Sequence, residues 1–210
     1  MPTTRILLLR HAETAAPDLF HGSESDVGLG GRGRRQALDV STLLASMRPD
    51  ALVCSAMRRA RETAVPIAEA CGLGIEVVPD LHERRMGSLS GRDKAEGWDD
   101  YLATIRRWAA GDLDATIGDA ETYAEIRDRV VPALRDVVRR HGGRTVAVVA
   151  HGMVTRVALT SLLEGYTPAN FEDIAIENAA VNDILVDGGI WRATRLGIAA
   201  DSTGSAWGDR

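Results

Sequence analysis

Short apolar runs alternate with segments of helical periodicity along most of this chain of 210 residues. We expect the apolar runs to be strands, because they are short, rich in Val, Ile and Leu, and bounded by charged or turn residues. They are residues 5–9, 51–54, 75–78, 145–150 and 181–186, with 190–194 as a sixth. This alternation predicts an α/β fold, a three-layer sandwich in which helices cover both faces of a mostly parallel sheet of about six strands.

The segments between these runs predict the helices. Apolar residues at helical spacing precede the second run at 40–47 and follow it at 60–68, where Gly72 should end the helix. Residues 126–137 predict a long helix, which Pro132 should kink or split because proline removes an internal hydrogen bond. A last helix should follow His151.

The helical pattern loosens between about residues 90 and 120, and we interpret this segment as a small helical cap inserted into the fold. Four apolar or aromatic residues could share one face of a helix there: Trp98, Tyr101, Ile105 and Trp108. No repeat or linker divides the chain. We therefore expect a single domain over residues 1–198 and a flexible, small and polar tail over 199–210.

Composition narrows the classes of function. The formal net charge is -5 and no Lys- or Arg-rich run is present, which argues against a nucleic-acid partner. No apolar stretch approaches the roughly 20 residues of a membrane span, and the first residues do not resemble a signal peptide. Cys54 and Cys71 are interpreted as small core residues without a disulfide. We expect a cytoplasmic protein that does not bind a membrane.

Two of the predicted strands end in a histidine. The first apolar run leads into Arg10 and His11, and "TVAVVAHG" ends in His151 and Gly152. In open α/β sheets the carboxyl ends of the strands converge where ligands bind. Both histidines should therefore lie at the same edge of the sheet.

A third strand should bring Ser55 and then Arg58 to this edge, at the start of a helix whose positive end favours an anion. Guanidinium groups match phosphate oxygens through paired hydrogen bonds, and a neutral imidazole can attack phosphorus. Neither histidine loop offers the paired carboxylates that hold Mg²⁺. These residues predict phosphoryl transfer through a histidine, with no metal and no other cofactor.

The segment "GLGGRG" fits the Gly-x-Gly-x-x-Gly pattern of dinucleotide-binding proteins. In such proteins the glycines leave a strand directly, whereas nearly twenty residues separate this segment from the first strand. We reject the nucleotide interpretation and place Gly33 in the start of a helix.

Several segments, in the same order, resemble the motifs of the histidine phosphatase superfamily, also called the phosphoglycerate mutase-like family. "LLLRHAET" is similar to its Arg-His-Gly signature, with Ala12 where Gly is commoner. "SAMRRARETA" resembles its Ser-x-x-x-Arg-Ala-x-x-Thr-Ala block, with one shifted position. The further matches are "LGGRGRRQA", "LHERRMGSLSG", "DAETYAEIRDRV", "VVAHGMVTR" and "ENAAVNDI", so that the resemblance spans residues 5 to about 186.

The resemblance implies five catalytic residues. His11 would be the nucleophile that takes the phosphoryl group. Arg10, Arg58 and His151 would bind and stabilise that group, and Glu83 would protonate the leaving group and then activate water. The two other arginines of the block, Arg59 and Arg61, are interpreted as solvated surface residues.

Substrate contacts are less well defined. The backbone N–H of Gly152 should reach the phosphate. Many relatives have Asn and Arg near the phosphate where this chain has Pro17 and Leu19, and the nearest polar candidates to replace them are His21, Ser23 and Ser25. Glu121 either approaches the substrate or is a carboxylate favoured by a helix N-terminus.

We expect a metal-independent phosphatase that hydrolyses a small phosphomonoester through a phosphohistidine on His11. Phosphoglycerate mutase-type transfer is the main alternative, and a catalytically silent phosphate-binding module is another. A protein-phosphohistidine phosphatase is less favoured, because such relatives are shorter. The partner would be a phosphorylated small molecule, and an exposed apolar face of the cap would support a homodimer.

Overall fold

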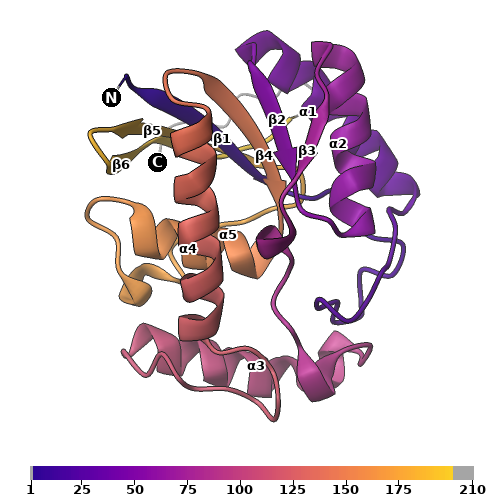
Figure 1. Cartoon of the computed structure of the whole chain (residues 1–210). Coiled ribbons are helices and arrows are strands. Elements are labelled where there is room, and N and C mark those ends of the chain that lie inside the picture. The colour runs from indigo at the N-terminus through magenta and orange to yellow at the C-terminus, as the bar shows by residue number, and fades with distance from the viewer. Residues whose placement is uncertain (1, 201–210) are drawn as a thin grey trace.

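The computed structural model describes residues 2–200 and contains one six-stranded sheet (Figure 1). Its order is β3-β2-β4-β1-β5-β6. The first four of these pair in parallel, whereas β5 runs antiparallel to both β1 and β6. The strands are β1 (Thr4–Arg10), β2 (Ala51–Cys54), β3 (Ile75–Val77), β4 (Thr145–Ala150), β5 (Val181–Asp187) and β6 (Ile190–Ile198). The six predicted strands are confirmed.

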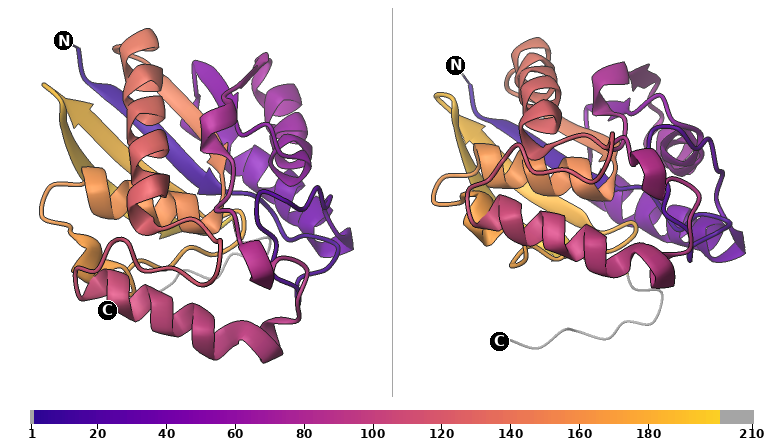
Figure 2. Two further views of the ribbon diagram at one scale, coloured as in Figure 1. Left: turned by 60° about the horizontal axis from the view of Figure 1, so that its bottom comes forward. Right: turned by 90° about the horizontal axis from the view of Figure 1, so that it is seen from below.

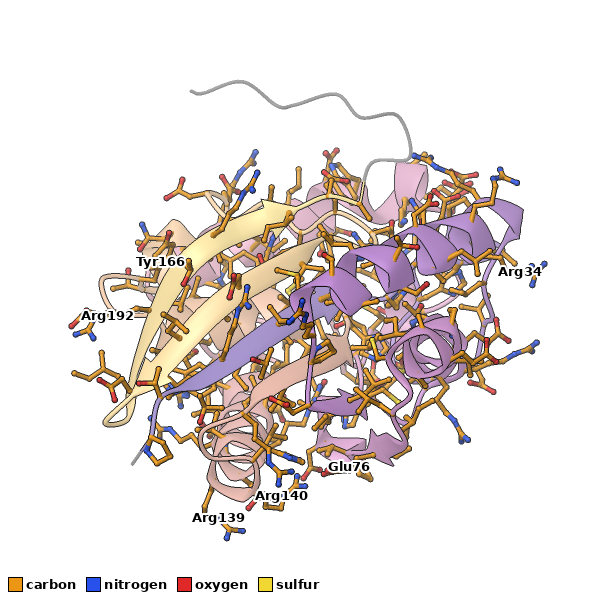
Figure 3. The ribbon with its side chains drawn as sticks, turned by 90° about the horizontal axis from the view of Figure 1, so that it is seen from above. Arg34, Glu76, Arg139, Arg140, Tyr166 and Arg192 are labelled. Carbon is orange, nitrogen blue, oxygen red and sulfur yellow. The ribbon has the colours of Figure 1, made fainter. Side chains whose placement is uncertain are left out.

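Helices cover both faces of the sheet, as the sequence predicted. The helices are α1 (Gly31–Met47), α2 (Arg58–Cys71), α3 (Lys94–Ala109), α4 (Tyr123–Arg140) and α5 (Gly152–Leu162). Leu7 and Leu9 of β1 face α1 and α2, whereas Ile6 and Leu8 face α4 and α5. Seen from above in Figure 3, the sheet runs between these two layers. Alternate residues of one buried strand therefore contribute to two separate cores.

The sequence predicted a kink or a split of α4 at Pro132, and the helix is continuous from Tyr123 to Arg140, so no split occurs (Figure 1). Its apolar face is fully buried at Ile126, Val130 and Val137. Burial of that face stabilises the helix by more than one lost hydrogen bond costs. At the end of α4, Arg140 pairs with Glu76 of β3 at the edge of the molecule (Figure 3).

The cap helix α3 lies across the end of the domain toward which β1 and β4 point (Figures 1 and 2). Ile105 and Trp108 bury its inner face, and Trp108 donates a hydrogen bond from Nε1 to the Ala115 carbonyl oxygen at 2.8 Å. Trp98, at the other end of the helix, is 44% exposed. The structure thus has the helical cap that the aromatic spacing predicted, close to the carboxyl edge of the sheet.

Backbone hydrogen bonds join the loop after β1 to the start of the cap. The Phe20 N–H donates to the Arg92 carbonyl oxygen at 2.9 Å, and the Phe20 carbonyl oxygen accepts from the Gly91 N–H at 2.9 Å. The Lys94 N–H donates to the Asp18 carbonyl oxygen at 2.8 Å. Residues 18–20 and 91–94, far apart in sequence, are therefore joined side by side.

Both cysteines are free thiols, as expected: Cys54 is buried in β2 and Cys71 is half-buried at the end of α2. Within residues 2–200, none of the helices combines the length and the apolar character needed to cross a bilayer. Residues 201–210, most of the expected flexible tail, lie outside the described residues.

Candidate active site

The carboxyl ends of β1 and β4 bring two histidine rings together. These strands are parallel neighbours in which Arg10 pairs with Ala150, so the next residue of each strand is His11 or His151. The His11 N–H continues the ladder by donating to the Ala150 carbonyl oxygen at 2.9 Å. The ring centroids lie 5.2 Å apart, with an angle of 61° between the planes. The structure therefore places both rings within reach of one small group.

The hydrogen bonding of His11 determines which ring nitrogen is nucleophilic. Nδ1 lies 2.7 Å from the Ala12 carbonyl oxygen, which can only accept, so Nδ1 carries the proton. Burial lowers the pKa of His11 well below its usual value of 6.5, and the positive charges of Arg10 and Arg59 lower it further. The ring is therefore neutral at pH 7, with its lone pair on Nε2.

His151 is fully buried beside the His11 ring. Its Nε2 lies 2.8 Å from the Ser55 hydroxyl oxygen, whereas its Nδ1 is buried with no hydrogen-bond partner in the described part of the chain. Burial lowers the pKa of His151 well below 6.5, and the positive charge of Arg59 acts in the same direction. When Ser55 donates to Nε2, Nδ1 carries the proton and is a free donor.

Arg10 lies at the N-terminus of α5. Its Nη1 donates to the Ile176 carbonyl oxygen at 2.9 Å, and its Nε is buried without a partner among residues 2–200. Gly152 allows this approach, because a Cβ at that position would lie 3.3 Å from Arg10 Nε. Arg10 and Gly152 both line the cavity described below.

The structure reverses the two arginine assignments at the start of α2. The Arg58 side chain is 60% exposed and pairs with Glu62 on the outer surface at 2.7 Å. Arg59 is fully buried, and its charge is among those that lower the pKa of both histidines. Its guanidinium donates to Ser25 and Gly22 carbonyl oxygens at 2.9 and 3.2 Å.

The reason for the error is helix phase, since successive residues of a helix point about 100° apart. The signal was present in the sequence. Counted from Ser55 without any shift, the arginine of the Ser-x-x-x-Arg-Ala-x-x-Thr-Ala block is Arg59, and Thr63 is its threonine. The Thr63 hydroxyl accepts from the Ala12 N–H at 3.0 Å and donates to the Arg59 carbonyl oxygen at 2.7 Å. The block thus ties α2 to the loop that carries His11.

Glu83 lies over the N-terminus of α5. Its Oε1 accepts from the N–H groups of Arg84 at 2.9 Å and Val154 at 3.3 Å, and its Oε2 accepts from Met153 at 3.3 Å. The side chain is buried but lines the same cavity as His11. A carboxyl group that shares this cavity with His11 is in a suitable place to exchange protons with a bound group or water.

Two predicted substrate contacts do not reach this cavity. Ser23 is held through its backbone N–H, which donates to the Arg84 carbonyl oxygen at 3.1 Å. Glu121 is buried in an ion pair with Arg129 at 2.9 Å. Of the three polar candidates near Pro17, only His21 lines the cavity.

The cavity has a volume of about 650 Å³ and lies between the sheet edge and α3. At its base are His11, Arg10 and Glu83. Its walls hold aromatic, apolar and basic side chains, among them Phe20, Trp98, Tyr101, Lys94, Arg106 and Arg156. In the described residues, no three His, Cys, Asp or Glu side chains lie close enough to hold a metal ion.

Sequence reasoning missed the basic groups of the wall. Lys94, the only lysine of the chain, and Arg106 both come from α3. The Arg156 Nε donates to the Ile174 carbonyl oxygen at 2.9 Å, while the side chain lines the cavity. That Lys94 is the only lysine was the one local sign in the sequence of a basic group in the cavity wall. The positions of Arg106 and Arg156 depend on how the cap packs.

The model of the histidine phosphatase superfamily, branch 1, matches residues 6–199 of this chain. Together with the paired histidines at the carboxyl edge of the sheet, this match shows that the chain belongs to the histidine phosphatase superfamily.

Individual relatives have both phosphatase and mutase names. The chain is 33% identical over 185 residues to a metal-independent phosphoserine phosphatase of Arabidopsis thaliana, which covers 85% of this chain and 75% of that protein. It is 30% identical over 199 residues to a probable phosphoglycerate mutase GpmB of Enterobacter sp., covering 90% and 88%. A mycobacterial glucosyl-3-phosphoglycerate phosphatase, solved in complex with VO3, is 26% identical with a TM-score of 0.81, covering 93% and 99%.

Proposed function

We propose that this chain is a metal-independent phosphatase that hydrolyses a small phosphomonoester through a covalent phosphohistidine on His11. One observation carries the proposal. Arg10, Arg59 and His151 each have a buried nitrogen without a hydrogen-bond partner among the described residues. All three residues lie close to His11. Buried donors without partners are rare in folded proteins. We infer that an anion bound beside His11 Nε2 is the missing partner of these three nitrogens.

In the first step, His11 Nε2 attacks phosphorus with its lone pair. The P–N bond forms while the bond from phosphorus to the ester oxygen breaks, and the departing oxygen takes a proton from Glu83. Arg10, Arg59 and the N-terminus of α5 stabilise the negative charge that develops on the phosphoryl oxygens. The products are the free alcohol, phosphohistidine and the Glu83 carboxylate.

In the second step, the Glu83 carboxylate takes a proton from water as the water oxygen attacks phosphorus. The P–N bond breaks, and its electron pair returns to His11 Nε2. Inorganic phosphate leaves, and Glu83 is again protonated for the next turnover. Glu83 therefore serves as acid and then as base, which its place at the base of the cavity supports.

The side chains that line the cavity next to His11 favour hydrolysis over mutase-type transfer. A mutase must hold the dephosphorylated intermediate until the phosphoryl group returns to it. Pro17 and Leu19 line the cavity where relatives offer polar contacts, so they provide no side-chain hydrogen bond for this purpose. Water would therefore reach the phosphohistidine before the group is returned.

The proposal is tested with the nucleophile and a matched histidine. His11→Ala should lose phosphate release from a panel of phosphomonoesters by several orders of magnitude, and should lose the alkali-stable label left by a ³²P-labelled substrate. His141 pairs with Glu76 away from the cavity, so His141→Gln should keep both. Full activity or labelling in pure, folded His11→Ala would overturn the mechanism.

The alternatives give different results in the same assays. A mutase would interconvert 2- and 3-phosphoglycerate faster than it releases phosphate. A silent phosphate-binding module would bind inorganic phosphate without hydrolysing even an activated aryl phosphate.

A further inference from the structure

Glu83 is carried by a segment that has no regular secondary structure. Residues 82–86 lie between two single 3₁₀ turns, Pro79–Leu81 and Gly87–Leu89. The carboxylate itself is held by α5 only through two contacts of 3.3 Å. These are long for N–H to oxygen hydrogen bonds. The position of the carboxyl group must therefore depend on how the backbone of this segment is fixed.

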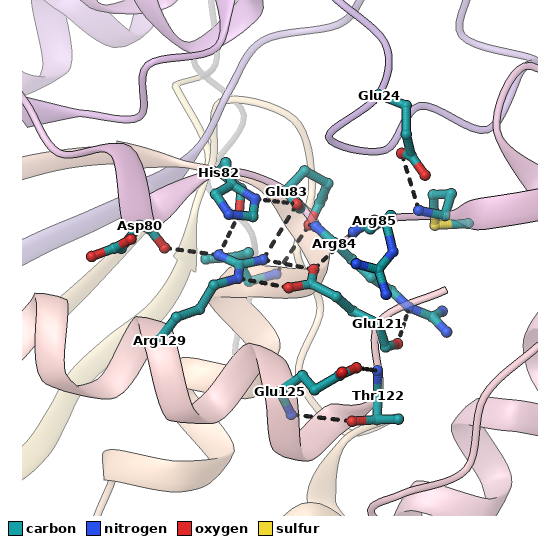
Figure 4. A network of polar contacts seen from close by, with 12 residues as sticks. Glu24, Asp80, His82, Glu83, Arg84, Arg85, Glu121, Thr122, Glu125 and Arg129 are labelled. Atoms are coloured by element: carbon teal, nitrogen blue, oxygen red, sulfur yellow. Dashed lines mark hydrogen bonds and ion pairs between the residues drawn. The ribbon is translucent and has the colours of Figure 1, made fainter. Parts of the chain in front are cut away.

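Arg129 of α4 fixes the residues up to and including Glu83. Its Nη1 donates to the carbonyl oxygens of Asp80 and His82, both at 2.8 Å, and its Nη2 lies 3.3 Å from the carbonyl oxygen of Glu83 (Figure 4). The rigid guanidinium thus spans three carbonyl groups of the segment.

Glu121 fixes the residues after Glu83 and also orients Arg129. Its two carboxylate oxygens accept from Arg129 Nε and Nη2, both at 2.9 Å, and Oε2 also accepts from the Arg85 N–H at 2.8 Å (Figure 4). The Glu121 carbonyl oxygen accepts from Arg84 Nε at 2.8 Å. The side chains of Glu121 and Arg129 are only 10% and 15% exposed, and neither lines the cavity.

We propose that the Glu121–Arg129 ion pair positions Glu83 for proton transfer, by holding the backbone on both sides of it. The inference rests on the proposed function, because it gives Glu83 the proton-transfer role. Glu121 and Arg129 touch neither substrate nor the reacting atoms, so they are positioning residues. Their loss should impair the protonation of the leaving group and leave the attack by His11 intact.

The test compares two leaving groups of similar size. Phenyl phosphate releases a phenol with a pKa of about 10, like that of tyrosine, and needs a proton donor. 4-Nitrophenyl phosphate releases a far more acidic phenol and does not. The rate of phosphoenzyme formation in a single turnover is measured for each, because the later hydrolysis of phosphohistidine is common to both.

Three variants are used: Arg129→Met, Glu121→Gln, and the double variant. The double variant is included because removal of one partner leaves a buried charge unpaired and can unfold the protein. A misplacement of about 1 Å can cost about 100-fold in rate. We expect phosphorylation by phenyl phosphate to fall about 10- to 100-fold, and that by 4-nitrophenyl phosphate to fall less than about threefold. Glu83→Gln should show the same selective loss.

A matched control is the ion pair of Arg5 with Asp183, also two-pronged and partly buried, with bonds of 2.9 and 2.7 Å. It lies at the amino end of β1, away from Glu83. Asp183→Asn should leave the ratio of the two rates unchanged. Equal losses with both phosphates, or no loss with either, in the Arg129 and Glu121 variants would overturn the inference.

Failure of the proposed function has a different signature. In that case the unaltered enzyme itself forms no phosphoenzyme, and the inference falls with it. Amide hydrogen exchange adds a second readout. Exchange at Arg84 and Arg85 should accelerate in Arg129→Met and not in Asp183→Asn, and unchanged exchange would also overturn the inference.

Discussion

The neighbouring arginines at the start of α2 provide the most direct check of the site. Both carry the same charge, one residue apart, yet Arg58 faces solvent and Arg59 is buried beside the histidines. We predict that Arg59→Lys lowers kcat strongly and Arg58→Lys does not. The substitution keeps the charge at both positions and removes only the planar fork of donors.

The expected size follows from burial. Arg59 is fully buried, so a donor lost there is not replaced by water, and the loss of one preorganised donor to a developing oxyanion typically costs about 100- to 1000-fold in kcat. That corresponds to about 2.7–4 kcal/mol of transition-state stabilisation. Arg58 contacts Glu62 at the surface only, and its replacement should leave kcat unchanged within error.

The assay is steady-state hydrolysis of 4-nitrophenyl phosphate, with urea unfolding of each variant as a companion measurement. Arg59 also holds the Ser25 and Gly22 carbonyl oxygens, so some loss of stability is expected. Hydrolysis rates are therefore compared at urea concentrations well below the unfolding midpoint of each variant, where all of them are folded. A large loss of kcat in Arg58→Lys, or a normal kcat in folded Arg59→Lys, would refute the assignment of Arg59 to the phosphate site.

Two further predictions concern stability. Because burial lowers the pKa values of His11 and His151, the unfolded chain binds more protons than the folded one below pH 6.5. The free energy of unfolding should therefore fall by up to about 1.4 kcal/mol per histidine between pH 7.5 and pH 5.5, and by less in His11→Gln. Urea unfolding measures this, and a free energy of unfolding that does not change with pH would contradict it. A Cβ at Gly33 would lie 1.9 Å from the Glu13 carbonyl oxygen, whereas one at Gly31 would meet no atom within 4 Å. Gly33→Ala should therefore destabilise by about 1–3 kcal/mol and Gly31→Ala should not, as measured by thermal unfolding.

The sheet could be predicted almost completely because strand and helix periodicities are local. Runs such as 145–150 are buried on both faces and therefore appear as unbroken apolar sequence. The meeting of His11 with His151 followed from the same rule, since both come directly after parallel strands. These inferences needed no knowledge of side-chain packing.

The errors at the candidate site concern the direction of a side chain rather than the place of its backbone. Arg58 and Arg59 share a helix turn, and only the start of α2 determines which one faces inward. Glu121 was expected to approach the substrate or to be favoured by a helix N-terminus, but its carboxylate turns toward Arg129, which is eight residues further along the chain. The direction of Glu121 depends on distant contacts that a single sequence does not contain, whereas the unshifted motif already indicated Arg59.

The hydrogen bonds between residues 18–20 and 91–94 have a practical consequence for protein engineering. Exchange of the cap alone for that of another phosphatase would cut three backbone hydrogen bonds and leave a mismatched seam beside His21, which lines the cavity. A chimera designed to accept a different phosphomonoester should therefore replace the loop after His11 and α3 together.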